Sequence, residues 1–171
     1  MPKDISPAGL RRLLPDTSLM LIVPLLAASL PVPAAHAAAF VSGKERKCLA
    51  TAIYFEARGE TEQGQKGVAQ VILNRVENDA YPDTICGVVY QNQNRRNACQ
   101  FSFACDGQPE RTSEPKAWKK AQAVAAEVLD GRNLIQSIRT ATHYHANYVS
   151  PSWAPKLKRL SKIGRHIFYS T

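Results

Sequence analysis

Apolar residues recur every three or four positions in the first part of the chain after residue 40, which is the spacing of a helix that buries one face. A helix is expected over residues 44–58, ending at Gly59, with an apolar stripe of Leu49, Ala52 and Ile53. A second helix is expected from about residue 62 to 76. Thr61 is its expected N-cap, and its buried stripe consists of Val68, Val71, Ile72 and Val76.

Two further helices are expected later in the chain. Thr84 can cap a short helix that contains Ile85, Val88 and Val89. A longer helix is expected from the N-cap Ser113, with Pro115 in its first turn, to a stop at Gly131. Most of the chain after residue 40 therefore reads as helical.

Strand patterns are fewer and shorter. Residues 99–105 alternate Phe101 and Phe103 with polar residues, which is the period of a strand, and they follow a polar loop over residues 91–97. Residues 140–148 and 164–169 are rich in aromatic and β-branched residues and are two more strand candidates. The pattern predicts an α+β domain that is mainly helical and has a small β element.

The first 39 residues have the order of a signal peptide. Basic residues are followed by an apolar run over residues 13–30 and then by small residues up to Ala39. Two cleavage signals of the A-x-A kind lie at residues 35–37 and 37–39. An uncleaved membrane anchor is the alternative, but the prolines and Asp16 inside the run favour a signal peptide that contacts the membrane only during export.

Cleavage after residue 39 leaves residues 40–171, which is 132 residues and the usual size of one domain. This part keeps about +7 of the net charge of +8, which favours an anionic target. Nucleic acid is disfavoured by the export signal, and the basic runs Arg95–Arg96 and 156–159 read as solvated charge. We expect a monomer in the periplasm or outside the cell.

All four cysteines, namely Cys48, Cys86, Cys99 and Cys105, lie after the signal segment. An even number of cysteines in an exported chain indicates two disulfides. Three pairings are open, and we favour Cys99 with Cys105 and Cys48 with Cys86. Zinc ligation is less favoured because the chain has no C-x-x-C pair.

Glu56 is the first candidate for chemistry. It follows Leu49 by seven residues and Ala52 by four, so it continues the apolar stripe of the first helix. Burial would raise the pKa of this carboxyl group, as a glycosidase acid requires, although a salt bridge to Arg58 or a role in capping a loop is an equally simple interpretation. Glu60 lies four residues later, and support of the helix end is its favoured role.

His143 and His145 would share one face of a strand, and His166 could complete a set of three zinc ligands. No H-E-x-x-H helix accompanies them, and the aromatic and amide residues between them suit sugar contacts equally well. We therefore expect neither a metal nor another cofactor. A zinc-dependent peptidoglycan amidase that uses these three histidines remains an alternative function.

Several motifs resemble one known family. The run A-I-Y-F-E-A-R-G-E over residues 52–60, with V-A-Q-V-I-L-N-R over 68–75, is similar to the spore-cortex-lytic, SleB-type cell wall hydrolases. Residues 100–102 and A-T-H-Y-H-A-N-Y-V-S over 141–150 resemble later parts of that family. The resemblance covers about residues 47–169.

The resemblance implies a lysozyme-like domain that cleaves the glycan strand of peptidoglycan between N-acetylmuramic acid and N-acetylglucosamine. It implies a lytic transglycosylase, with Glu56 as acid and base and with 1,6-anhydro-muramoyl products. A family role in spore germination does not carry over, and a non-catalytic glycan-binding protein is a second alternative. The expected substrate-binding residues are Gln100, Ser102, His143, Tyr144, Asn147 and Tyr148, with Glu60 and Arg58 as structural support.

Overall fold

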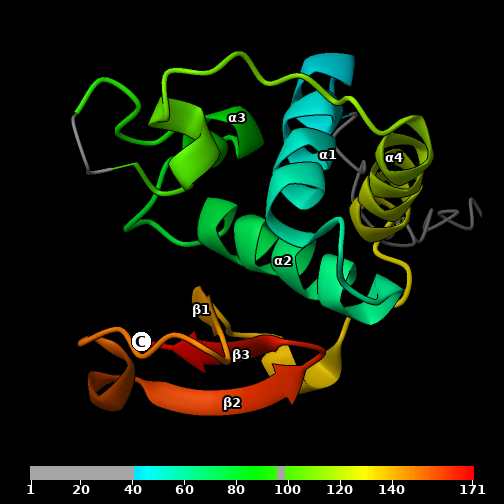
Figure 1. Cartoon of the computed structure of the whole chain (residues 1–171). Coiled ribbons are helices and arrows are strands. Elements are labelled where there is room, and N and C mark those ends of the chain that lie inside the picture. Colours follow the sequence, from blue (N-terminus) through cyan, green and yellow to red (C-terminus); the bar gives the residue numbers. More distant parts are fainter. Residues whose placement is uncertain (1–40, 96–98) are drawn as a thin grey trace, which may run out of the picture. The chain divides into compact units, whose positions relative to one another are not determined.

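The computed structural model of the chain describes residues 41–95 and 99–171. The expected signal peptide over residues 1–39 lies outside the described residues. Four α-helices pack together, and a three-stranded sheet lies beneath helix α2 (Figure 1). The prediction of a mainly helical α+β fold with a small sheet is confirmed. Within the described residues, no helix has the length and apolar character needed to cross a membrane.

The first two helices lie close to their predicted positions. Helix α1 is Gly43–Ala57, and the Ser42 hydroxyl caps it by accepting from the backbone N–H of Glu45 at 3.2 Å. Helix α2 is Glu62–Val76, capped as expected by Thr61. One position of the predicted stripe is wrong, because Val76 is only half-buried and its neighbour Arg75 is buried instead.

The short helix α3, Ile85–Val89, is capped by Thr84 as predicted. Helix α4 is Pro115–Leu129, so the expected start at Ser113 is wrong. Proline disfavours the helical conformation of the residue before it, and Glu114 is accordingly extended. The predicted stop at Gly131 is confirmed by its positive φ of 67°, a conformation that glycine adopts without strain.

The predicted strand over residues 99–105 is wrong. Residues Ser102–Cys105 form a 3₁₀ turn instead. The Cα atoms of Cys99 and Cys105 lie 6.2 Å apart in a disulfide, whereas six residues of strand would separate them by about 20 Å. The bridge therefore forces this segment to turn, and both phenylalanines between the cysteines point into the core.

Three strands form an antiparallel sheet in the order β1-β3-β2. Strands β1, His143–Ala146, and β3, His166–Ser170, lie within or close to two of the predicted strand segments. Strand β2, Lys158–Ile163, was missed, and part of it was interpreted as solvated charge. It is an edge strand with exposed basic residues and an irregularity between Arg159 and Ser161, so it lacks a simple alternating pattern.

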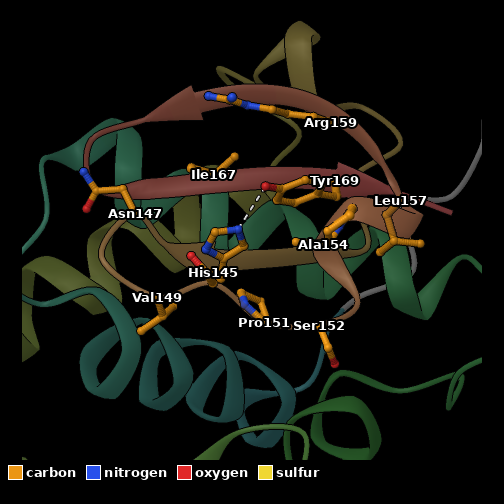
Figure 2. Close-up of a pocket in the computed structure, with 12 residues that line it drawn as sticks. His145, Asn147, Val149, Pro151, Ser152, Ala154, Leu157, Arg159, Ile167 and Tyr169 are labelled. Atoms are coloured by element: carbon orange, nitrogen blue, oxygen red, sulfur yellow. Dashed lines mark hydrogen bonds between the residues drawn. The ribbon is translucent and has the colours of Figure 1, made fainter.

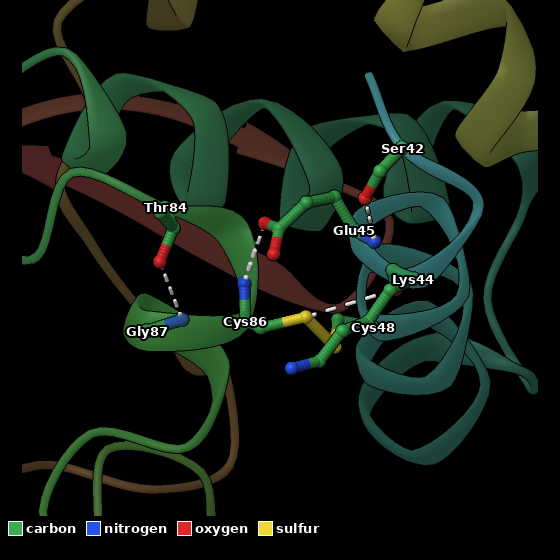
Figure 3. Close-up of a disulfide and its surroundings, with 7 residues drawn as sticks. All are labelled: Ser42, Lys44, Glu45, Cys48, Thr84, Cys86 and Gly87. Atoms are coloured by element: carbon green, nitrogen blue, oxygen red, sulfur yellow. Dashed lines mark hydrogen bonds between the residues drawn. A yellow bond between two sulfur atoms is a disulfide. The ribbon is translucent and has the colours of Figure 1, made fainter.

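Both favoured disulfides are present. The Cys48–Cys86 bridge joins α1 to the start of α3 (Figure 3). The backbone N–H of Cys86 also donates to the Glu45 carboxylate at 2.9 Å, so two interactions hold the same pair of helices. The second bridge is Cys99–Cys105, and no free cysteine remains.

The sheet is attached to the helices through α2. One core cluster lies among the helices, and a second consists of Val71, Ile138, Ala141 and Phe168. The Phe168 ring lies so close to Gly67 that a Cβ atom on Gly67 would be 2.6 Å from its Cζ atom. Glu60, beyond the end of α1, accepts hydrogen bonds from the backbone and side chain of Arg165 in the turn between β2 and β3.

Replacing Gly67 by Ala is predicted to destabilise the protein. Alanine alone would favour the helix by about 1 kcal/mol, but the clash with fully buried Phe168 costs about 1–3 kcal/mol. Thermal unfolding of Gly67→Ala should occur below the wild-type temperature. Gly43→Ala is the matched control, because nothing lies within 4 Å of its added Cβ. A Gly67→Ala variant as stable as wild type would contradict the described packing.

The two disulfides should differ in their contribution to stability. Their cysteines are 38 and 6 residues apart, and loop-closure entropy assigns about 4 kcal/mol to the longer loop and about 2 kcal/mol to the shorter. Denaturant unfolding should show a larger loss for Cys48→Ala/Cys86→Ala than for Cys99→Ala/Cys105→Ala. The reverse order would mean that the shorter bridge stabilises native contacts beyond closing its loop.

Candidate active site

Glu56 lies in the last turn of α1, where its half-buried side chain faces strand β1 of the sheet. The hydroxyl of Tyr144, the second residue of β1, donates to Glu56 Oε2 at 3.1 Å. Tyr144 pairs with Phe168 across the sheet, and both rings are on the side that packs against the helices. The sheet therefore brings one hydroxyl to the one carboxyl group that interrupts the apolar stripe of α1.

Arg75 of α2 is buried beside this pair, with 2 % of its surface exposed. Its Nε donates to the carbonyl of Thr142 at 2.8 Å, and its guanidinium lies over the rings of Tyr81 and Phe101 at 5.4 and 5.7 Å. When the Gln100 amide is oriented with its oxygen toward the guanidinium, that oxygen accepts from both Nη atoms at 3.1 Å. Arg75 thus links Thr142, immediately before β1, to the loop closed by the Cys99–Cys105 bridge, which we call the disulfide loop.

Burial and two neighbouring groups act on the pKa of Glu56 in opposite directions. Burial raises the pKa of Glu56, and the Tyr144 hydrogen bond and the Arg75 charge partly oppose this rise. Burial also raises the pKa of Tyr144 well above its usual value, so this phenol remains a donor. The arrangement provides one carboxyl group whose protonated form is favoured by burial and whose ionised form has a hydrogen-bond donor and a nearby positive charge.

The disulfide loop supplies the side of the site that faces Arg75. Phe101 and Phe103 are buried, and Phe103 stacks on Phe55 of α1 with ring centroids 4.8 Å apart. The alternating residues Gln100 and Ser102 are exposed. The loop therefore has a buried aromatic anchor and an exposed polar edge, although it is not a strand.

The other charged residues of the E-A-R-G-E run point elsewhere. Arg58 is exposed, donates to Glu114 at 2.9 Å and lies over the Tyr54 ring. The helix ends at Ala57, so Glu60 does not continue the Glu56 face and instead binds Arg165 of the sheet. Burial opposes ionisation of Glu60, but the hydrogen bonds from Arg165 outweigh it and lower its pKa. Glu60 is therefore an ionised link between the turn after α1 and the sheet.

The three histidines do not converge. Because side chains alternate along a strand, His143 and His145 lie on the face of β1 opposite Tyr144. His166 pairs with Ala146, and so shares the Tyr144 face. Among residues 41–95 and 99–171, no group of three or more His, Cys, Asp or Glu side chains could hold a metal ion. The described geometry therefore gives the zinc amidase no ligand set.

Two further predicted binding residues lie immediately after β1. Asn147 and Tyr148 follow β1 and are exposed, Tyr148 by 78 %. His145 and Asn147 line a groove on the sheet face opposite Tyr144, which we call the outer face (Figure 2). Of the predicted contact residues, Tyr144 reaches Glu56 directly and Gln100 reaches its neighbourhood through Arg75.

Arg75 is a residue of the candidate site that was not predicted from the sequence. It follows Val68 by seven residues, Val71 by four and Ile72 by three, so it continues the apolar stripe of α2. The same spacing singles out Glu56 on α1. A charged residue at a stripe position on each of two successive helices was therefore the available signal for this pair.

Comparisons with known proteins agree with the motifs. A family model described as Cell Wall Hydrolase matches residues 59–169. Spore cortex-lytic enzymes from Oceanobacillus iheyensis and Bacillus cereus are 33 % and 34 % identical, over 74 % of this chain and 42 % and 44 % of theirs. The chain thus spans less than half the length of these relatives.

One solved structure has a similar fold at a comparable level of identity. It is the catalytic domain of the germination-specific lytic transglycosylase SleB from Bacillus anthracis, 30 % identical with a TM-score of 0.61. The match covers 75 % of this chain and 96 % of that domain. The chain therefore belongs to the cell wall hydrolase family, together with the SleB-type spore cortex-lytic enzymes.

Proposed function

We propose that this protein is a lytic transglycosylase that cleaves the glycan strand of peptidoglycan between N-acetylmuramic acid and N-acetylglucosamine. The observation that carries the proposal is the half-buried carboxyl group of Glu56, whose pKa is raised by burial and which accepts a hydrogen bond from Tyr144. Family membership supports the substrate class, and the SleB catalytic domain is described as a lytic transglycosylase.

The first step is protonation of the bond to be cleaved. Glu56 donates its proton to the oxygen between the two sugars, and the bond from that oxygen to the muramoyl C1 breaks. The electron pair leaves with the oxygen, and positive charge develops at C1. Glu56 becomes a carboxylate, which the Tyr144 hydroxyl and the nearby Arg75 guanidinium stabilise.

The second step returns the proton to Glu56. The carboxylate accepts the proton of the muramoyl C6 hydroxyl while the oxygen of that hydroxyl attacks C1 and closes the 1,6-anhydro ring. No water is consumed, and the carboxyl group ends protonated for another cycle. One acid that acts twice is sufficient, so no second carboxylate is needed as nucleophile.

The neighbouring Glu60 fits this division of roles. Its carboxylate is occupied by the backbone and side chain of Arg165, and its side chain is only 5 % exposed. We infer that Glu60 and Arg58 support the structure, while Gln100 and Tyr144 contact the glycan beside Glu56. Ser102, which is exposed on the same loop as Gln100, is the next candidate for glycan contact.

We propose that the protein acts outside the cytoplasm, as a monomer on peptidoglycan strands. The basis is the signal-like segment over residues 1–39, two disulfides and the positive net charge. A non-catalytic glycan-binding protein remains the rival function, and it would not need the raised pKa of Glu56.

Replacing Glu56 by Gln should abolish activity and preserve the fold. The amide is nearly the same size but cannot donate and then accept the proton, and general acid-base catalysis is worth about 10²- to 10⁴-fold. Release of soluble muropeptides from purified sacculi should fall by at least the upper value, because one group acts in both steps. Thermal unfolding should remain close to wild type.

Glu60→Gln is the matched control, since it removes a carboxylate from the same motif. It should lower the unfolding temperature by weakening the Arg165 link, and it should lose less activity than Glu56→Gln. A folded Glu56→Gln variant that retains a sizeable fraction of wild-type turnover would exclude Glu56 as the acid. An inactive wild-type protein that binds sacculi would favour the non-catalytic alternative.

Tyr144→Phe should shift the pH dependence of activity to higher pH. Activity needs protonated Glu56 and is lost as the pH rises through its raised pKa. The Tyr144 hydrogen bond lowers that pKa, so its removal should shift the basic limb of kcat/KM to higher pH. The exposed Tyr148→Phe is the control and should leave the limb in place. A shift to lower pH in Tyr144→Phe would contradict the assigned hydrogen bond.

A further inference from the structure

The charge of the protein is divided unevenly along the chain. Residues 40–130, which include the four α-helices, contain twelve Lys and Arg and twelve Asp and Glu. Residues 131–171, which include the sheet, contain seven Lys and Arg and no Asp or Glu. The net positive charge after the expected signal peptide therefore belongs to the segment that forms the sheet.

The register of β2 places two of these cations on the outer face. Arg159 pairs with Tyr169 and Lys162 pairs with Ile167, and both partners alternate with the inward-facing Phe168. Residues three apart share this face because of the irregularity between Arg159 and Ser161. Both cations are exposed, and neither takes part in an ion pair among the described residues.

A groove of about 590 Å³ runs along the outer face beside Arg159 (Figure 2). His145 and Tyr169 line it from the sheet, and Val149, Pro151 and Ser152 border it on the side away from Arg159. None of the described residues that line it is acidic. Its volume is that of sites for small ligands, enough for a few residues of a peptide.

The aromatic side chains at the groove already stack on one another and form hydrogen bonds with one another. The His145 and Tyr169 rings stack with centroids 5.3 Å apart, and the Tyr169 hydroxyl lies 2.9 Å from His145 Nε2. His145 Nδ1 donates to the carbonyl of Ala146, because a carbonyl oxygen can only accept. Trp153 packs its edge against both rings. The aromatic surface is therefore fixed, and Arg159 is the permanently charged group of the lining.

We propose that this groove binds the carboxylate end of a peptide stem of peptidoglycan. The planar guanidinium of Arg159 matches a carboxylate in shape and charge, and short apolar side chains of the stem lie against His145 and Tyr169. The inference rests on the proposed function, since it adds a second contact with the same substrate on the sheet face opposite Tyr144 and Glu56.

Titration calorimetry with a free stem pentapeptide that ends in D-alanine tests this groove. Wild-type protein should bind the peptide, and Arg159→Gln should raise the Kd by about tenfold or more, the usual effect of losing a charge-assisted hydrogen bond. A peptide with its terminal carboxylate amidated should bind as weakly to wild type as the free peptide binds to the variant. Thermal unfolding should be unchanged, because Arg159 is exposed.

Lys158→Gln is the matched control. It removes one positive charge from the neighbouring position of β2, which pairs with Ser170 and alternates with the outer face. Its Kd should stay within about twofold of wild type, because Lys158 is exposed on the face of β2 opposite Arg159 and cannot form the same hydrogen bond to the ligand. An equal loss in both variants, no binding by wild type, or equal affinity for the amidated peptide would overturn the proposal. Tighter, Arg159-dependent binding of a glycerol phosphate polymer would assign the groove to a different wall component.

The test is separate from the test of catalysis. Glu56→Gln should bind the pentapeptide with the wild-type Kd, because Glu56 lies against the opposite face of β1. If wild-type protein binds the peptide through Arg159 but releases nothing from sacculi, the lytic function fails and the groove assignment stands. If it cleaves sacculi but does not bind the peptide, the groove assignment fails and the lytic function stands.

Discussion

The close contact between Phe168 and Gly67 determines how the sheet meets the helices. The ring occupies the place of the missing Gly67 side chain, so β3 approaches α2 more closely than any other residue at position 67 would allow. Strand β1 pairs with β3, and this register brings Tyr144 to Glu56. The hydrogen bonds between Glu60 and Arg165 hold the turn before β3 close to the end of α1. The acid and its hydrogen-bond donor therefore depend on a packing contact that involves neither of them.

Each charged residue of the E-A-R-G-E run has a different contact in this arrangement. Glu56 faces the sheet, Arg58 lies on the Tyr54 ring, and Glu60 binds the turn between β2 and β3. The Arg165 guanidinium donates to the Gly59 carbonyl and lies so close to Gly59 that an added Cβ atom there would be 3.1 Å from Arg165 Nη2. Within five residues, one segment supplies the proposed acid and the ion pair that holds the nearby turn of the sheet.

Local periodicity was sufficient to predict the approximate positions of the helices and that Glu56 continues the apolar stripe of α1, and the number and spacing of the cysteines predicted both disulfides. Periodicity failed where long-range contacts decide the structure. The alternation of Phe101 and Phe103 resembles a strand, but the Cys99–Cys105 bridge closes the segment into a turn. Strand β2 is basic and irregular, and only pairing with β3 makes it a strand. The stripe position of Arg75 is visible in the sequence, but its partners, the Thr142 carbonyl and Gln100, are distant in sequence and only the fold identifies them.

The central claim is that one carboxyl group, Glu56, cleaves the glycan by closing a ring within the substrate and without consuming water. Mass spectrometry of products from sacculi digested in water enriched in heavy oxygen tests this claim most directly. The account predicts 1,6-anhydro-muramoyl ends that carry no heavy oxygen. Reducing muramoyl ends that contain the label would show hydrolysis, and released stem peptides with intact glycan would show an amidase; either result would contradict the account.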